Sequence, residues 1–160
     1  MPEVTLGITH GIGAMAVPYR RWPHAAPTFN AMLRTAERLK AARAHELGII
    51  DGIADDVDHL VALAVARARE LAGKVRPIGD DPVKVSITPV EARAASGQVL
   101  SRECIELMER SILEAAAAAS FAEALEVGYR SFGLSACLDS AREGITAFKE
   151  KRTPDFTKTK

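Results

Sequence analysis

The chain has no net charge: lysine plus arginine and aspartate plus glutamate each number 21 among its 160 residues. A neutral chain has no general attraction for nucleic acid or for an anionic membrane surface. The opening residues lack a basic start followed by a long apolar run, and the apolar stretches elsewhere are too short to span a bilayer. These absences predict a soluble protein that binds neither nucleic acid nor membranes.

Cysteine is also scarce, since only Cys104 and Cys137 are present and they lie far apart in the sequence. Neither belongs to a CxxC or Cys/His spacing, and the histidines His24, His45 and His59 have no spacing typical of metal ligands. We therefore predict no disulfide framework and no metal site. A reducing, cytoplasmic location is the default for such a chain.

Aromatic residues make up only 5% of a chain that is 48% hydrophobic, and the surplus is alanine. Alanine favours closely packed helices over β-sandwiches. The length fits one compact domain rather than two. The composition thus predicts a mainly α fold.

One or two short strands are expected at the N-terminal end, and an edge strand is an open alternative in the loop after Lys74. Residues Val4 to Ile8 lead into a glycine turn and predict one N-terminal strand. The alternating apolar residues at 83, 85 and 87 indicate an edge strand beside the surface loop that begins at Lys74. From Gly13 to Pro27 three prolines predict a short helix start followed by loop, and Asn30 is expected to cap a short helix.

Helices are predicted from caps and from apolar stripes. One helix is expected from Val57 to Leu71, after two aspartates and before Gly73, and Gly48 is expected to end another in the left-handed conformation. Three capping boxes, each a hydroxyl followed three residues later by a glutamate, are Thr88/Glu91, Ser120/Glu123 and Ser140/Glu143. Apolar stripes of the C-terminal half are Ile105, Met108, Ile112 and Ala116, and then Phe121, Leu125, Tyr129 and Phe132.

Three stretches resemble the crotonase superfamily, the enoyl-CoA hydratase/isomerase family, in the order found there. PEVTLGITHGIG is similar to the segment that follows the family's oxyanion loop, and AARAHELGIIDGIADD is similar to its alanine-rich helix and turn. SAREGITAFKEKRTPDF is similar to its C-terminal signature. The resemblance covers nearly the whole chain and implies the C-terminal half of a crotonase (ClpP/crotonase-like) fold.

The resemblance also implies a division of the chain. Residues 1–73 correspond to the C-terminal end of the crotonase core, 74–88 to a loop or insertion, and 89–160 to a helical region for oligomerisation and CoA contact. The implied partners are further copies, as a trimer or a dimer of trimers, and a chain that supplies the N-terminal half. His10 replaces the family's usual proline, and Ala14 to Ala16 replace its glycine-threonine-glutamine.

By position in its motif, Glu3 matches the second catalytic glutamate of the family's hydratases, an acid/base group. Phe148 and Lys151 match residues that contact the CoA nucleotide, where a ring stacks on adenine and an ammonium meets phosphate. The substrate is then a coenzyme A thioester whose enolate is stabilised by two backbone N–H groups, and no other cofactor is implied. Those donors and the other glutamate belong to sequence expected before Met1, so the chain is expected to be incomplete as an enzyme.

Other interpretations remain open. A non-catalytic helical oligomerisation or scaffold module is the alternative function, and basic residues after Phe148 are also explained by the helix dipole alone. Gly11 and Gly13 resemble a dinucleotide loop only weakly, because no acidic residue on a second strand completes the unit. His10 lies close to Glu3 in the sequence and titrates near neutrality, or it is simply a loop histidine bonded to backbone.

Overall fold

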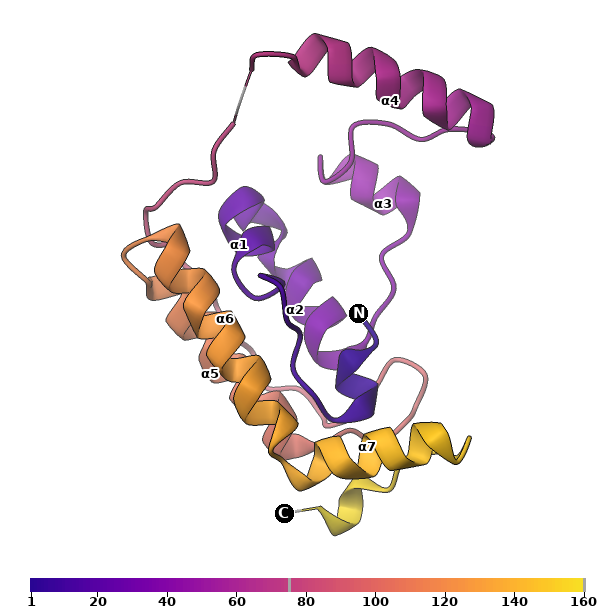
Figure 1. The fold of residues 1–160 in the computed structure, drawn as a ribbon, viewed down its shortest axis with the longest axis vertical. Coiled ribbons are helices and arrows are strands. Elements are labelled where there is room, and N and C mark those ends of the chain that lie inside the picture. The colour runs from indigo at the N-terminus through magenta and orange to yellow at the C-terminus, as the bar shows by residue number, and fades with distance from the viewer. Residues whose placement is uncertain (75, 160) are drawn as a thin grey trace. The chain divides into compact units, whose positions relative to one another are not determined.

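The computed structural model describes residues 1–74 and 76–159 (Figure 1). Val75, inside the loop predicted at 74–88, and Lys160, at the end of the region predicted at 89–160, lie outside the described residues. The chain divides into a larger unit, Met1–Arg38 with Gly79–Lys160, and a smaller unit, Leu39–Ile78. The larger unit contains η1 (Glu3–Leu6), α1 (Val17–Arg21), η2 (Pro23–Ala25), α2 (Ala26–Thr35), α5 (Arg102–Ala117), α6 (Phe121–Ala136), α7 (Asp139–Lys149) and η3 (Phe156–Lys158), and the smaller unit contains α3 (Ala41–Glu46) and α4 (Val57–Leu71).

The mainly α character is confirmed, but the predicted N-terminal strand at Val4–Ile8 is wrong. Residues Glu3–Leu6 form a 3₁₀ turn, in which the Thr5 hydroxyl donates to the Pro2 carbonyl and Gly7 closes the turn with φ +70°. A strand needs a neighbour to satisfy its backbone groups, and the described residues form no strand that pairs with this segment.

The predicted edge strand at 83–87 and the capping box Thr88/Glu91 are also wrong. The described residues from 76 to 100 contain no helix and only an isolated bridge between Arg93 and Val99. Buried polar side chains of α1 and α2 hold residues 79–88 of this segment by their carbonyls: Arg20 donates to Gly79, Asp80 and Asp81, Asn30 to Ser86, and Arg34 to Thr88. These bonds satisfy backbone groups that a helix or ladder otherwise satisfies.

The short helix start expected after Gly13 is confirmed as α1, whereas α2 begins at Ala26, before the cap expected at Asn30. Each helix accepts a proline in its first turn, Pro18 in α1 and Pro27 in α2, where the missing N–H has no intrahelical partner anyway. Asn30 is therefore not a cap. It lies inside α2, buried, and accepts a hydrogen bond from the Tyr19 hydroxyl at 2.7 Å.

Helices α5 and α6 pack against each other along most of their length (Figure 1). The predicted stripe of α5 is confirmed, since its four residues are at most 5% exposed. The predicted stripe of α6 is wrong, because Tyr129 and Phe132 are 51% and 42% exposed. The buried residues of α6 are Ala124, Val127, Gly128, Ser131 and Ser135. Bulky α5 side chains thus meet mostly small residues on α6.

The helix caps are confirmed at one of the three predicted boxes. Ser120 accepts from the Glu123 N–H, and the Glu123 carboxylate accepts from the Ala119 N–H. Ser140 lies inside α7 instead, where its hydroxyl donates to the Gly7 carbonyl at 2.9 Å. The cap of α5, Ser101, lacked a glutamate three residues on and was not predicted.

The smaller unit contains the predicted helix Val57–Leu71, with Asp56 accepting from the His59 N–H at its start. Gly48, with φ +63°, follows the end of α3 as predicted. None of the residues of α4 is buried. Within the described part of the chain, no helix has both the length and the apolar character needed to cross a membrane.

Candidate functional site

Glu3 and His10 are brought together at the start of the larger unit. The Glu3 Oε2 atom lies 2.9 Å from His10 Nδ1, and His10 Nε2 lies 2.9 Å from the Leu33 carbonyl oxygen. The imidazole is 1% exposed, whereas the Glu3 side chain is 39% exposed. The pair therefore links a solvent-accessible carboxylate to a buried ring that is fixed at both nitrogens.

The bonding of this pair requires a proton between its two members. A carbonyl oxygen only accepts, so Nε2 of His10 carries a hydrogen and donates to Leu33. The Nδ1–Oε2 bond then needs a second proton, on the imidazole or on the carboxyl group of Glu3. Burial lowers the pKa of His10 from its ordinary value, while the Leu33 carbonyl and the Glu3 carboxylate oppose that shift. The arrangement is suited to passing a proton between ring and carboxyl group.

Close backbone contact between η1 and α7 positions Glu3. A Cβ on Gly144 would lie 2.0 Å from the Leu6 carbonyl oxygen, and a Cβ on Gly7 would lie 2.6 Å from the Ser140 carbonyl oxygen. Only glycine permits this approach at Gly144, and Gly7 also has a left-handed backbone. The contact joins the first and the third of the three stretches that resemble the crotonase family.

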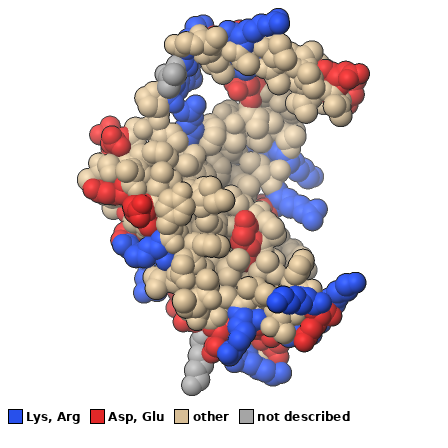
Figure 2. Space-filling model, in the orientation of Figure 1, with Lys and Arg blue, Asp and Glu red and all other residues tan. Residues whose placement is uncertain are grey.

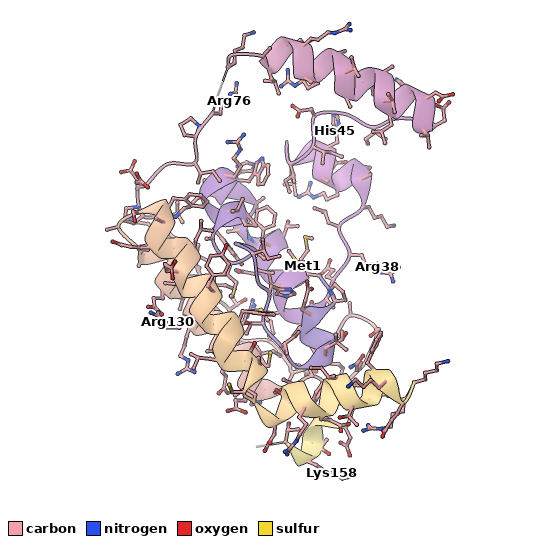
Figure 3. All side chains as sticks on the ribbon, in the orientation of Figure 1. Met1, Arg38, His45, Arg76, Arg130 and Lys158 are labelled. Carbon is pink, nitrogen blue, oxygen red and sulfur yellow. The ribbon has the colours of Figure 1, made fainter. Side chains whose placement is uncertain are left out.

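Two open hollows are lined in part by these elements, one of about 440 Å³ by α7 with the chain end and one of about 610 Å³ by η1. The one beside η1, about 610 Å³, is lined by residues that include Met1, Pro2 and Arg38 (Figure 3). Glu3 is next to this lining in the chain but does not form part of it. The carboxylate is thus near an accessible space without facing an enclosed acyl pocket.

A cluster of three buried hydroxyl groups, those of Thr9, Ser131 and Ser135, lies next to His10 and was not predicted. The Thr9 N–H and Thr9 Oγ1 lie 3.1 and 3.2 Å from Ser135 Oγ, and Ser131 Oγ lies 3.4 Å from Thr9 Oγ1. Ser135 donates to the Phe132 carbonyl. The only sequence signal for this cluster is that Ser131 and Ser135 are four residues apart, which places them on one face of α6. The cluster anchors the residue next to His10 on α6.

Phe148 and Lys151 lie together at the C-terminal end of α7. Phe148 is 72% exposed, and the Lys151 N–H donates to the Phe148 carbonyl at 3.2 Å. Lys151 has φ +57°, which ends the helix and turns the chain back. An exposed ring and an exposed ammonium group therefore occupy neighbouring positions, as contact with a nucleotide requires.

The rest of the C-terminal signature forms an ion-pair cluster that folds the chain end onto α7, and Lys158 lies beside it (Figure 3). Arg152 binds both carboxylate oxygens of Glu143 and also Glu150, and Glu143 accepts from the Asp155 N–H. These contacts lower the pKa of Glu143 to about 2. Charges of both signs alternate over this end of the molecule (Figure 2), so Arg152 is not free for a phosphate.

Comparison with known proteins identified no relative: no family description, no curated protein and no solved structure matched the chain.

Proposed function

We propose that this chain acts in acyl-CoA chemistry as part of an enoyl-CoA hydratase/isomerase-type protein in the cytoplasm. The hydrogen-bonded pair of Glu3 and His10 is the observation that carries the proposal. Glu3 exchanges a proton with the α-carbon region of a CoA thioester, and buried His10 orients the carboxyl group and takes up or returns a proton. His10 acts through Glu3 and is a positioning residue.

The contact of η1 with α7 supports the same proposal. Two of the three stretches that resemble the family pack on each other through Gly7 and Gly144. Glycine at these positions is explained by the packing, so the resemblance and the contact geometry agree. The proposed chemistry also needs two oxyanion donors that stabilise the enolate, and the proposed working assembly is a homo-oligomer.

The CoA contact is assigned to Phe148 and Lys151. Titration of CoA into the ¹⁵N-labelled chain is expected to shift the amide signals of residues near 148–151, with weak affinity because two side chains offer few contacts. Phe148→Ala and Lys151→Ala should abolish the shifts. Phe132→Ala and Lys149→Ala are matched controls, another exposed phenylalanine and a neighbouring lysine, and should leave them unchanged.

Activity tests the role of Glu3. With crotonyl-CoA alone, the chain is expected to show no measurable hydration, because removing even one oxyanion donor costs about 3–4 kcal/mol in well-studied hydrolases. Hydration followed by loss of thioester-conjugated absorbance is the assay. Robust turnover that is abolished by Glu3→Gln would show that the chain is complete by another arrangement. CoA shifts that Phe148→Ala and Lys151→Ala leave unchanged would instead overturn the assignment of the nucleotide contact.

A non-catalytic oligomerisation module is the second candidate. It is favoured by apolar side chains that α6 leaves exposed, Tyr129, Phe132 and Leu134, which are 42–52% exposed. Light scattering distinguishes association from a monomer. Association without any CoA-dependent shift would favour this candidate over acyl-CoA chemistry.

A further inference from the structure

Helix α4 has an apolar face that its own unit leaves uncovered. Segment 51–52 lies on one side of the helix, where Asp51 binds Arg67 at 2.9 Å and a Cβ on Gly52 would lie 3.9 Å from Leu63. On another side, Val57 and Val61 are 73% and 57% exposed. Such a face in water is unfavourable, so a covering partner would stabilise it.

The spacing on this face is that of a helix–helix seam. Apolar residues recur at alternating intervals of four and three: Val57, Val61, Ala64, Ala68 and Leu71. This is the a/d pattern by which two helices interlock side chains over their whole length. Ala64, at the middle of the stripe, and Ala68, the next member, are small enough to permit close approach of the backbones of two paired helices.

The charges of α4 differ between its ends. Asp55, Asp56 and Asp58 lie at the N-terminal end, whereas at or just beyond the C-terminal end the basic residues Arg67, Arg69 and Lys74 outnumber Glu70, which binds Arg67. Figure 2 shows acidic side chains at one end of this helix and basic side chains toward the other, with a surface of neither charge between them. A partner helix that presents the same charges in the reverse direction is complementary.

We propose that α4 docks antiparallel against α4 of a second copy of this chain, around a two-fold axis near Ala64. A parallel pair would place six aspartates together at one end, and like charges at that distance repel. The antiparallel pair places each acidic end beside a basic end. The helix dipoles also oppose each other in this arrangement.

The flanks of the seam agree with this orientation. Asp58 and Arg69 are about three turns apart and lie on the same side of the stripe. With Ala64 near the axis, Asp58 of one copy is level with Arg69 of the other. Each dimer then contains two such pairs, at the edges of the seam where charges set partner orientation.

The seam is short: a helix of 15 residues is about 22 Å long. A contact of this length is below the size of a standard stable interface, so the dimer is expected to be reversible in the micromolar range. The inference concerns the smaller unit and does not depend on acyl-CoA chemistry.

Analytical ultracentrifugation of the full chain over a range of concentrations tests the proposal with a matched pair of variants. Ala64→Glu places a carboxylate in the seam and is expected to abolish the dimer. Ala66→Glu makes the same change two residues away, which is a rotation of about 200° around the helix, and should leave the dimer intact. Circular dichroism checks that both variants keep their helix content.

Charge reversal tests orientation without touching the seam. Asp58→Arg and Arg69→Asp should each weaken dimerisation about tenfold, and the double variant should restore it. In a Cys137→Ser background, a mixture of Val57→Cys and Leu71→Cys chains should form the 57–71 disulfide between two chains. Predominant 57–57 disulfides would overturn the antiparallel orientation.

Three results would overturn the proposed surface. One is a monomer at every concentration, and another is a dimer that Ala64→Glu leaves unchanged. The third is a dimer that Ala66→Glu and Ala64→Glu weaken equally.

Discussion

Helices α5 and α4 have similar patterns and opposite environments. Both are 15 or 16 residues long, begin after a capping side chain and contain an apolar stripe at helical spacing. The stripe of α5 is buried against α6, where Met108 and Ile112 are 0% exposed. The stripe of α4 contains no buried residue. A periodic pattern thus specifies the face of a helix but not the element that covers it.

The two units differ in the same way. The larger unit has a core to which all of its helices and several loop residues contribute, and its close contacts exclude any extra atom at Gly144. In the smaller unit, only Ala44 is buried among the described residues. Substitutions are therefore expected to affect stability strongly in one unit and weakly in the other.

The largest effect is expected at Gly144. Gly144→Ala places a Cβ where the Leu6 carbonyl oxygen lies, and both groups belong to backbone that cannot rotate away. The contact of η1 with α7 must open, so we expect a loss of about 4 kcal/mol or more in the free energy of unfolding. Urea denaturation followed by circular dichroism measures it.

Gly133→Ala is the matched control, a glycine inside α6 whose Cβ would meet nothing within 4 Å. Alanine restricts the unfolded chain more than glycine, so this variant should be more stable by about 0.5–1 kcal/mol. A Gly144→Ala protein as stable as the wild type would contradict the packing described for η1 and α7.

The comparison of the two stripes predicts the next largest difference. Ile112→Ala removes three buried carbons from the seam of α5 and α6 and should lower the free energy of unfolding by about 3 kcal/mol. Val61→Ala removes methyl groups that are exposed and should change it by less than about 0.5 kcal/mol at concentrations where the chain is monomeric. Equal losses of unfolding free energy in Ile112→Ala and Val61→Ala would mean that the stripe of α4 is buried to the same extent as that of α5.

Helix content and the α5 stripe were predictable because caps and spacing are local signals. The buried face of α6 was not predictable. Aromatic residues have larger transfer free energies than serine or glycine and were therefore expected to be buried, but the seam with α5 accommodates small residues. The expected strand at Val4–Ile8 failed because a strand depends on a partner elsewhere in the chain. Gly7 is expected from the sequence to form a turn after a strand, whereas in the structure it permits α7 to approach η1 closely.

Part of the candidate site was predictable from sequence order. Glu3 and His10 are seven residues apart, and a turn between them brings the side chains together. The Leu33 carbonyl that fixes the ring is distant in sequence, and so are the serines of α6 that bind Thr9. Phe148 and Lys151 are neighbours by sequence alone.

A smaller effect on stability is expected at Arg20, which binds the irregular segment 79–81 to the end of α5. Its guanidinium donates to five carbonyl groups, three in residues 79–81 and two at the end of α5, with no carboxylate involved. Arg20→Met keeps much of the apolar stem and leaves those carbonyls unpaired, so we expect a loss of about 2 kcal/mol. Arg110→Met, at an exposed position of α5, is the control and should be neutral.

Hydrogen exchange at Val83 gives a local measurement for the same variant. The Val83 N–H donates to the Ala116 carbonyl, next to the carbonyls that Arg20 binds. Arg20→Met should increase its exchange rate more than that of amides within α5. Protection equal to the wild type would show that the segment holds its place without Arg20.

The smallest effect is expected from the exposed ion pairs, Arg152 with Glu143 in the larger unit and Arg67 with Asp51 in the smaller one. Exposed pairs contribute little to stability in general. The Glu143 carboxylate differs because it binds Arg152 through both oxygens and also accepts from the Asp155 N–H, which lowers its pKa from 4.5 to about 2. A carboxyl group with a lowered folded pKa stabilises the folded state above its unfolded pKa and loses that contribution as the pH falls.

The attachment of the chain end to α7 should therefore be complete above about pH 4.5 and weaken progressively toward pH 2. Glu143→Gln should remove the Glu143 share of this dependence, because an amide does not titrate and cannot pair both oxygens with Arg152, and should leave the share of Asp155, whose pKa is also lowered to about 2. Glu150→Gln is the control, since Glu150 contacts Arg152 only at Nε. The carboxyl carbon shift of Glu143, followed by NMR from pH 6 to pH 2, measures the titration directly. A midpoint near the ordinary value of 4.5 would show that these contacts between Glu143, Arg152 and the Asp155 N–H do not form in solution.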